Sequence, residues 1–150
     1  MRAALSAQLG YVVGATLLAL WVCASGTQDV KVEDLKAEIV PNCILAVGEW
    51  GTEMVDHCVK EQGAALDAVI QYRTRDRDSV ARCTGRWKRN GWTEVKACVE
   101  HDLQASAALV EYRKQHEALV ATCQAQASHK GPAAIRACVE EALGPHPAGR

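Results

Sequence analysis

Six of the seven cysteines in this 150-residue chain recur at a fixed spacing that could support covalent or metal chemistry. They form three C-x14-C units with a period of forty residues: Cys43 and Cys58, Cys83 and Cys98, and Cys123 and Cys138. Paired cysteines can form disulfides, bind a metal ion or carry redox chemistry. Zinc sites and redox pairs usually contain two cysteines separated by two residues (C-x2-C), a spacing that is absent here. The pattern favours structural disulfides over its two alternatives, a thiol redox protein and a metal-binding protein.

The forty-residue period extends beyond the cysteines. When residues 43–82 are aligned with residues 83–122, Gly51 matches Gly91 and the pair Tyr72-Arg73 matches Tyr112-Arg113. The third unit, 123–143, keeps a glycine at Gly131 but is shorter than the other two. Terminal repeats are usually atypical, so the sequence predicts a tandem repeat with a truncated last unit.

The elements that carry the cysteines have helical periodicity, and no strand pattern is present. Between Gly91 and Gly131 there is no glycine or proline, and apolar residues recur at steps of three and four, which predicts a helix of about 35 residues. The first unit begins similarly at Thr52, but the charged segment 75–78 interrupts its apolar stripe. We expect the helix to continue through that segment. A break with Asp76 or Asp78 capping a new helix is the alternative.

The cysteine positions also predict which thiols pair. From Cys83 the chain runs seven residues to Asn90, turns at Gly91 and takes seven more to Cys98. Two antiparallel helical arms would bring both thiols to the same height, so we expect bridges at 43–58, 83–98 and 123–138. In the chain-entropy description each would contribute on the order of 3 kcal/mol. The expected fold is all-α, with stapled helical hairpins assembled as an up-down bundle or a short solenoid.

The N-terminus has the pattern of a secretory signal peptide. Arg2 precedes an apolar run from Leu9 to Cys23, and small residues follow. We expect residues 1–24 to be the signal, with cleavage at about 24–26, followed by a repeat domain at 27–143 and a flexible tail at 144–150. Cleavage would remove Cys23 and leave an even number of cysteines. The expected location is secreted or periplasmic, with membrane contact only if the N-terminal segment is not cleaved.

Composition and motifs restrict the class of function. The 17 basic and 18 acidic residues give no excess of positive charge, which argues against nucleic-acid binding. The five histidines lie in no recognisable catalytic, zinc or haem pattern, and there is no phosphate-binding glycine loop. We therefore expect no enzymatic activity, no cofactor and no metal. A structural or protein-binding role with an unknown protein partner is the main hypothesis.

One segment is a candidate binding site for another class of ligand. The predicted tip of the second hairpin contains two tryptophans and three cations: Arg86, Trp87, Lys88, Arg89 and Trp92. Such a tip could bind an anionic surface or a small ligand, since Trp and Arg are favoured at binding sites. The alternative is that both tryptophans pack across the turn while the cations are solvated.

Overall fold

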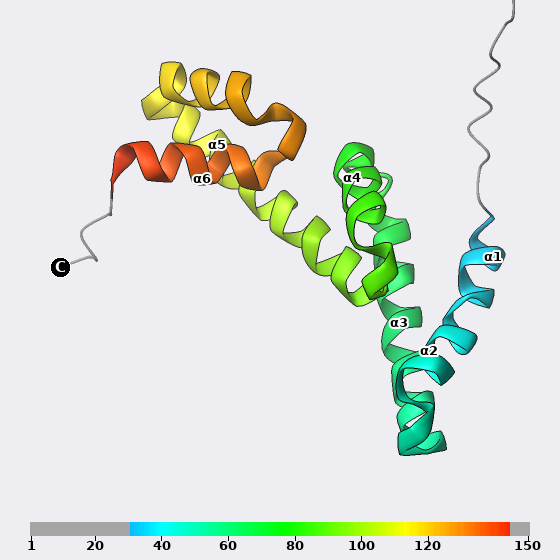
Figure 1. The fold of residues 1–150 in the computed structure, drawn as a ribbon. Helices are drawn as coiled ribbons and strands as arrows, with labels where there is room; N and C mark the ends of the chain where they lie inside the picture. The colour runs from blue at the N-terminus through cyan, green and yellow to red at the C-terminus, as the bar shows by residue number, and fades with distance from the viewer. Residues whose placement is uncertain (1–30, 145–150) are drawn as a thin grey trace, which may run out of the picture.

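The computed structural model describes residues 31–144, which are helical and contain no strand (Figure 1). This confirms the predicted all-α class. The α-helices are α1 (Val32–Ala37), α2 (Ile39–Val47), α3 (Thr52–Tyr72), α4 (Arg77–Trp87), α5 (Trp92–Ala127) and α6 (Pro132–Leu143). The connections are the 3-10 segments η1 (Gly48–Trp50), η2 (Lys88–Asn90) and η3 (Ser128–Lys130). The predicted signal peptide and residues 145–150 of the predicted tail lie outside the described residues.

Each hairpin reverses direction in the same way. A helix tightens into a 3-10 turn, a glycine follows, and the next helix starts at once. These glycines are Gly51, Gly91 and Gly131, with φ of 97°, 109° and 97°. Residues with a side chain rarely adopt such angles, so glycine at these three positions fixes where each hairpin turns.

The three predicted disulfides are all present. They link Cys43 to Cys58, Cys83 to Cys98 and Cys123 to Cys138, with Cα–Cα distances of 5.8, 5.8 and 5.7 Å. In every pair the first cysteine is buried in the core and the second is half-buried. Each bridge therefore closes its hairpin and also fills core volume.

The helix expected to continue through residues 75–78 is broken there, so that prediction was wrong. Helix α3 ends at Tyr72 and α4 begins at Arg77. Asp76 adopts a non-helical conformation, and its carboxylate accepts hydrogen bonds from the Ser79 N–H at 2.9 Å and the Ser79 hydroxyl at 2.7 Å. A capping aspartate stabilises a new helix start, which outweighs continuity in this polar segment.

The same break recurs in weaker form one repeat later. The residue forty positions after Asp76 is His116, which has the non-helical angles φ −136° and ψ 42° inside α5. There the two helical halves of α5 meet at a kink. The first half of α5 completes the second hairpin with α4, and its second half forms the third hairpin with α6.

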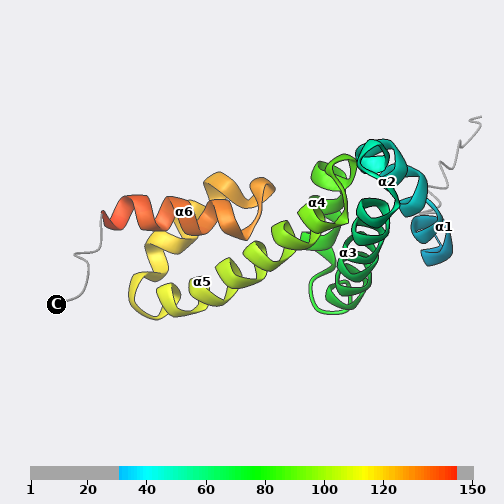
Figure 2. The same ribbon diagram turned by 90° about the horizontal axis from the view of Figure 1, so that it is seen from below.

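The hairpins form a short solenoid. In Figures 1 and 2, α1 and α2 lie at one end of the molecule and α6 at the other. One apolar core joins α2, α3, α4 and the start of α5, and a second joins Leu109 and the end of α5 to α6. Two separate cores in sequence are typical of hairpins that contact only their neighbours.

Tyrosines link successive hairpins at equivalent positions. The Tyr72 hydroxyl donates a hydrogen bond to Glu100 at 2.8 Å, and the Tyr112 hydroxyl donates to Glu140 at 3.2 Å. Lys96 also pairs with Glu100 at 3.0 Å, and these two partners hold the pKa of Glu100 below its ordinary value. The conserved forty-residue spacing thus reproduces the contact between hairpins as well as the hairpins themselves.

The helix break predicts a stability effect that depends on pH. Burial opposes ionisation of Asp76, but the hydrogen bonds from Ser79 outweigh it, so the pKa of Asp76 lies below its ordinary value of 3.8. A lowered pKa means that the ionised cap stabilises the fold at neutral pH and loses this effect as the pH falls below 3.8. We expect Asp76→Ala to lower the free energy of unfolding by about 1 kcal/mol at pH 7.

Urea unfolding with intact disulfides, followed by circular dichroism at pH 7 and at pH 3, measures the difference in free energy of unfolding between the natural chain and Asp76→Ala. This difference should be smaller at pH 3 than at pH 7. Asp78→Ala is the control, because Asp78 is exposed and is not the N-cap. An equal loss in both variants would contradict the assignment of Asp76 as the cap.

Candidate functional site

Open clefts lie where successive hairpins meet. The first cleft, between the first and second hairpins, has a volume of about 600 Å³, and the second cleft, between the second and third, about 830 Å³. Many of their lining residues are equivalent after a shift of forty, including the pairs Asn42 and Arg82, Cys58 and Cys98, Gln62 and Asp102, and Arg89 and His129. The cleft is therefore a repeated feature, and its chemistry differs between the two copies.

Polar side chains from one hairpin cap the helix of the next at these junctions. Neither α5 nor α6 receives a side-chain cap from its own N-cap glycine. Instead, Gln62 accepts a hydrogen bond from the Trp92 backbone N–H and donates one to the Thr93 hydroxyl at 3.2 Å. At the equivalent position, Asp102 accepts a hydrogen bond from the Ala133 N–H at 3.3 Å. Each cap ties two neighbouring hairpins together.

The second junction contains a buried ion pair. Asp102 is buried, and its Oδ2 lies 2.6 Å from Nη2 of the half-buried Arg82. The same guanidinium nitrogen donates to the Ser79 hydroxyl at 2.9 Å. Since a buried carboxylate needs a partner, Arg82 is the residue that allows Asp102 to act as the cap.

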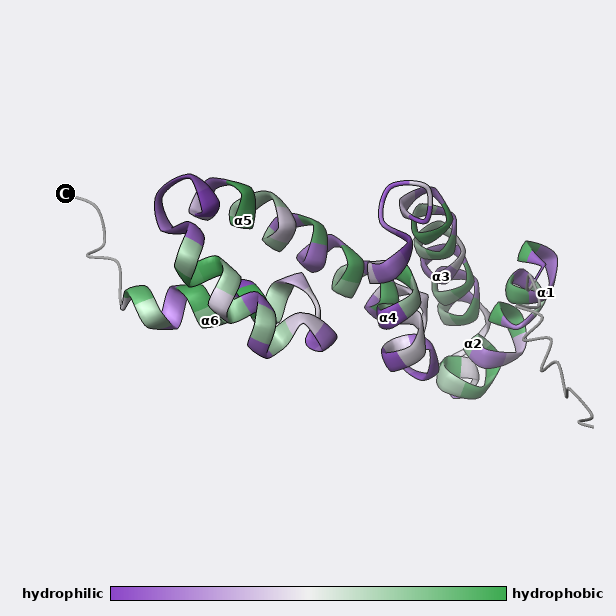
Figure 3. Cartoon of the chain, turned by 90° about the horizontal axis from the view of Figure 1, so that it is seen from above, coloured by the Kyte–Doolittle hydropathy of each residue, from purple (hydrophilic) through white to green (hydrophobic). Residues whose placement is uncertain are grey.

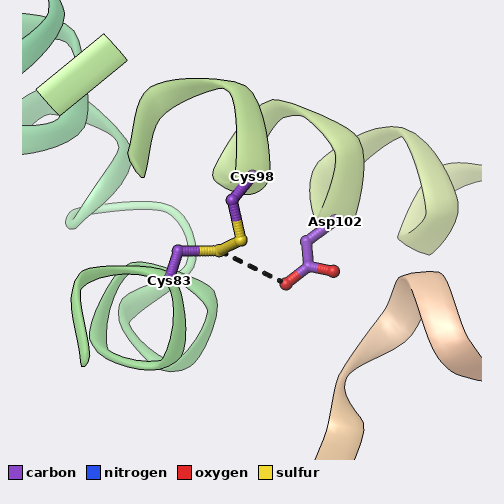
Figure 4. Close-up of side chains that lie close together, drawn as sticks. All are labelled: Cys83, Cys98 and Asp102. Carbon is purple, nitrogen blue, oxygen red and sulfur yellow. Dashed lines mark hydrogen bonds between the residues drawn. A yellow bond between two sulfur atoms is a disulfide. The ribbon is translucent and has the colours of Figure 1, made fainter. Parts of the chain in front are cut away.

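Asp102 also lies beside the second disulfide. Its Oδ2 is 3.9 Å from the Cys83 sulfur, and Cys98 completes the group in Figure 4. A bridged sulfur carries no hydrogen, so this is a packing contact. The two sulfurs and the Asp102 carboxylate could together hold a metal ion only if both sulfurs were free thiolates. In the described structure they are joined to each other.

The residues of the predicted binding tip are divided between the two clefts. Arg86 and Trp87 line the second cleft, whereas Lys88, Arg89 and Trp92 line the first. Trp92 is buried in the core. The Lys88 ammonium pairs with Glu38 at 2.8 Å, next to the first cleft. The five residues therefore do not form a single surface. Ligand binding by these residues stays a prediction.

The first hairpin exposes five large apolar side chains that the sequence analysis missed, and these are named here its apolar surface: Val40, Ile44, Leu45, Trp50 and Met54. Of the five, Leu45 also lines the first cleft. Leu45 is 86% exposed and Trp50 is 63% exposed. Helix α2, which carries three of the five, contains hydrophobic residues that are green in Figure 3.

A comparison between repeats could have revealed this surface. Val40 is 47% exposed, whereas the equivalent Val80 and Val120 are only 8% and 1% exposed. Ile44 is replaced by threonine and glutamine in the second and third units, and Leu45 by glycine and alanine. At positions 44 and 45, large apolar residues are thus specific to the first unit.

Comparison of the chain with known protein families, with curated proteins and with solved structures finds no match. Within residues 31–144, no helix combines the length and the apolar character needed to cross a membrane. The apolar run from Leu9 to Cys23 lies outside those residues.

Replacing Gly51 or Gly131 by alanine should lower the free energy of unfolding by different amounts, although the two glycines have the same backbone angle. A Cβ atom at Gly131 would lie 2.6 Å from Cζ of Arg82, whereas one at Gly51 would meet nothing within 4 Å. Both glycines have φ of 97°. We expect Gly51→Ala to cost about 1–2 kcal/mol through backbone strain. Gly131→Ala should cost about 1–2 kcal/mol more because Arg82 must leave Asp102.

Urea unfolding of the two single variants measures the difference, and Gly131→Ala combined with Arg82→Ala tests its cause. The extra cost of the Gly131 substitution should largely disappear when Arg82 is already absent. If the extra cost persists in the Arg82→Ala background, crowding against the ion pair is not its origin.

Proposed function

We propose that this protein is an exported, non-enzymatic scaffold that binds a protein partner through the apolar surface of its first hairpin. Export is supported by the three disulfides, which persist in oxidising compartments, and by the signal-like N-terminal sequence. Both observations support a secreted or periplasmic location.

The observation that carries the proposal is the exposure of large apolar side chains at the end of the solenoid. Terminal repeats of solenoid proteins normally present a polar outer face, which keeps them soluble. Here the terminal hairpin presents Ile44, Leu45 and Trp50 to solvent instead. Because large apolar residues are absent from the same positions in the other units, the repeat architecture does not require them. Gathered exposed apolar residues mark interaction surfaces.

The surroundings of this surface indicate the chemistry of the partner. Glu49, Glu53 and Asp56 are exposed on the same hairpin, next to Trp50 and Met54 in sequence. The complementary partner presents an apolar centre with basic residues around it, such as a basic amphipathic helix. Acidic neighbours disfavour an anionic membrane as the occupant because like charges repel.

The Cys43–Cys58 disulfide supports binding because it limits the motion of α2 relative to α3. Cys43 on α2 is bridged to Cys58 on α3, so the two helices that carry the apolar surface cannot separate. A surface that is already ordered loses less entropy when a partner binds. Aromatic anchors such as Trp50 commonly dominate the binding energy in surfaces of this kind.

A photo-cross-linking amino acid at position 45, introduced in the cells that make the protein, tests this proposal. We expect one discrete cross-linked product with a different protein. Trp50→Ala combined with Ile44→Ser should reduce its yield at least tenfold while the three disulfides remain intact. Position 110 is the matched control, because Val110 is also exposed but lies on α5, far from the first hairpin in sequence.

Two outcomes would contradict the proposal. Indistinguishable products from positions 45 and 110 would show that the surface has no partner of its own. Products made only of two copies of this chain would show that the surface mediates self-association and does not bind a different protein.

A further inference from the structure

We propose that the second cleft, between the second and third hairpins, binds a small organic anion that carries a phosphate or carboxylate group on an aromatic body. This site is separate from the apolar surface of the first hairpin and does not depend on the function proposed above.

The charges that line the second cleft leave cations without a carboxylate partner. Arg82 is neutralised by Asp102 at 2.6 Å, and among the other lining residues Arg86 and Lys130 face a single carboxylate, Glu94. Within residues 31–144, neither Arg86 nor Lys130 forms an ion pair. Two cations against one carboxylate leave a net charge of +1 before any contribution from the lining histidines, His101 and His129. A concave site with excess positive charge attracts anions.

The walls of the cleft suit a ligand with a flat apolar body. Trp87 is partly exposed, and the Arg86 guanidinium lies 5.7 Å from the centre of its ring. Ala97, Ala133 and Ala134 line the cleft with small side chains, which leaves space beside the indole. The volume of about 830 Å³ is within the range of small-molecule sites. An aromatic ring could stack on Trp87 while its anionic group meets Arg86 and Lys130.

The first cleft shows that these cations are not a requirement of the fold. At its equivalent positions Ala46 replaces Arg86 and Asn90 replaces Lys130. Its own Lys88 is already paired with Glu38 at 2.8 Å. Within the described part of the chain, Arg89 is then the one lining cation of the first cleft without an ion pair, whereas the second cleft has two, Arg86 and Lys130. The repeat therefore forms the same junction without Arg86 and Lys130, which leaves anion binding as a role for them in the second cleft.

Isothermal titration calorimetry of the disulfide-bonded mature chain with phenyl phosphate tests the site, and inorganic phosphate tests the contribution of the ring. We expect one binding site per chain for phenyl phosphate, with inorganic phosphate at least fivefold weaker. Arg86→Gln combined with Lys130→Gln should raise the Kd of phenyl phosphate at least tenfold. Lys88→Gln combined with Arg89→Gln is the matched control in the first cleft and should change it less than twofold.

Three results would overturn the proposal. They are no binding of phenyl phosphate at millimolar concentration, an equal loss in both double variants, and binding to phosphatidylglycerol vesicles without binding to phenyl phosphate. The second would indicate attraction by net charge alone, and the third would assign the cations to a membrane surface. Circular dichroism of both double variants establishes that each is folded, since all four side chains are exposed.

Discussion

The rest of the structure depends on one covalent constraint, the disulfide that closes each helical hairpin. The chain has no phenylalanine, and its buried apolar residues are mainly valine, alanine, isoleucine, leucine and half-cystine. Small side chains bury little area, so packing alone provides limited stabilisation to a hairpin of this size. A bridge with a sequence separation of 15 residues contributes on the order of 3 kcal/mol, by restricting the unfolded chain. Because this happens once in each hairpin, every unit starts from the same geometry.

The hairpins contact one another through a shared apolar core and through polar side chains that reach from one hairpin to the next. Gln62 and Asp102 reach from one hairpin to the helix start of the next, and Tyr72 and Tyr112 reach across to a glutamate. Hydrogen bonds need well-placed partners, and the bridges hold the partner helices in place. The clefts are the spaces left at these junctions. The same junction thus provides both cohesion and two potential binding sites whose lining residues are free to differ.

The periodic features of this fold could be predicted from the sequence because they repeat. Three identical cysteine spacings predicted the pairing, which the structure confirms, and a glycine midway between each pair predicted the turn. The break at Asp76 was predicted wrongly, because a charged segment is compatible both with a solvated helix and with a cap. The structure shows the cap, and the kink at His116 shows that the repeat favours a bend there even without an aspartate.

The candidate sites were harder to predict, because exposure is a property of the assembled chain. Trp87 and Trp92 look alike in the sequence, yet Trp92 is buried under the first cleft and Trp87 forms a wall of the second. Val40 lies on the same helical stripe as core residues. It is nevertheless 47% exposed, whereas the equivalent Val80 and Val120 belong to the two apolar cores. Helical periodicity identifies an apolar face but does not identify what packs on it.

Non-reducing peptide mapping of the protein isolated from the cells that make it tests the stapled hairpins most directly. Stapled hairpins and a cleaved signal predict bridges at 43–58, 83–98 and 123–138, no free thiol, and an N-terminus near Ser25 or Thr27. Those results would establish both the stapled hairpins and the oxidising compartment. Free thiols, or bridges between different hairpins, would contradict the stapled solenoid and make thiol or metal chemistry the leading explanation of the six cysteines.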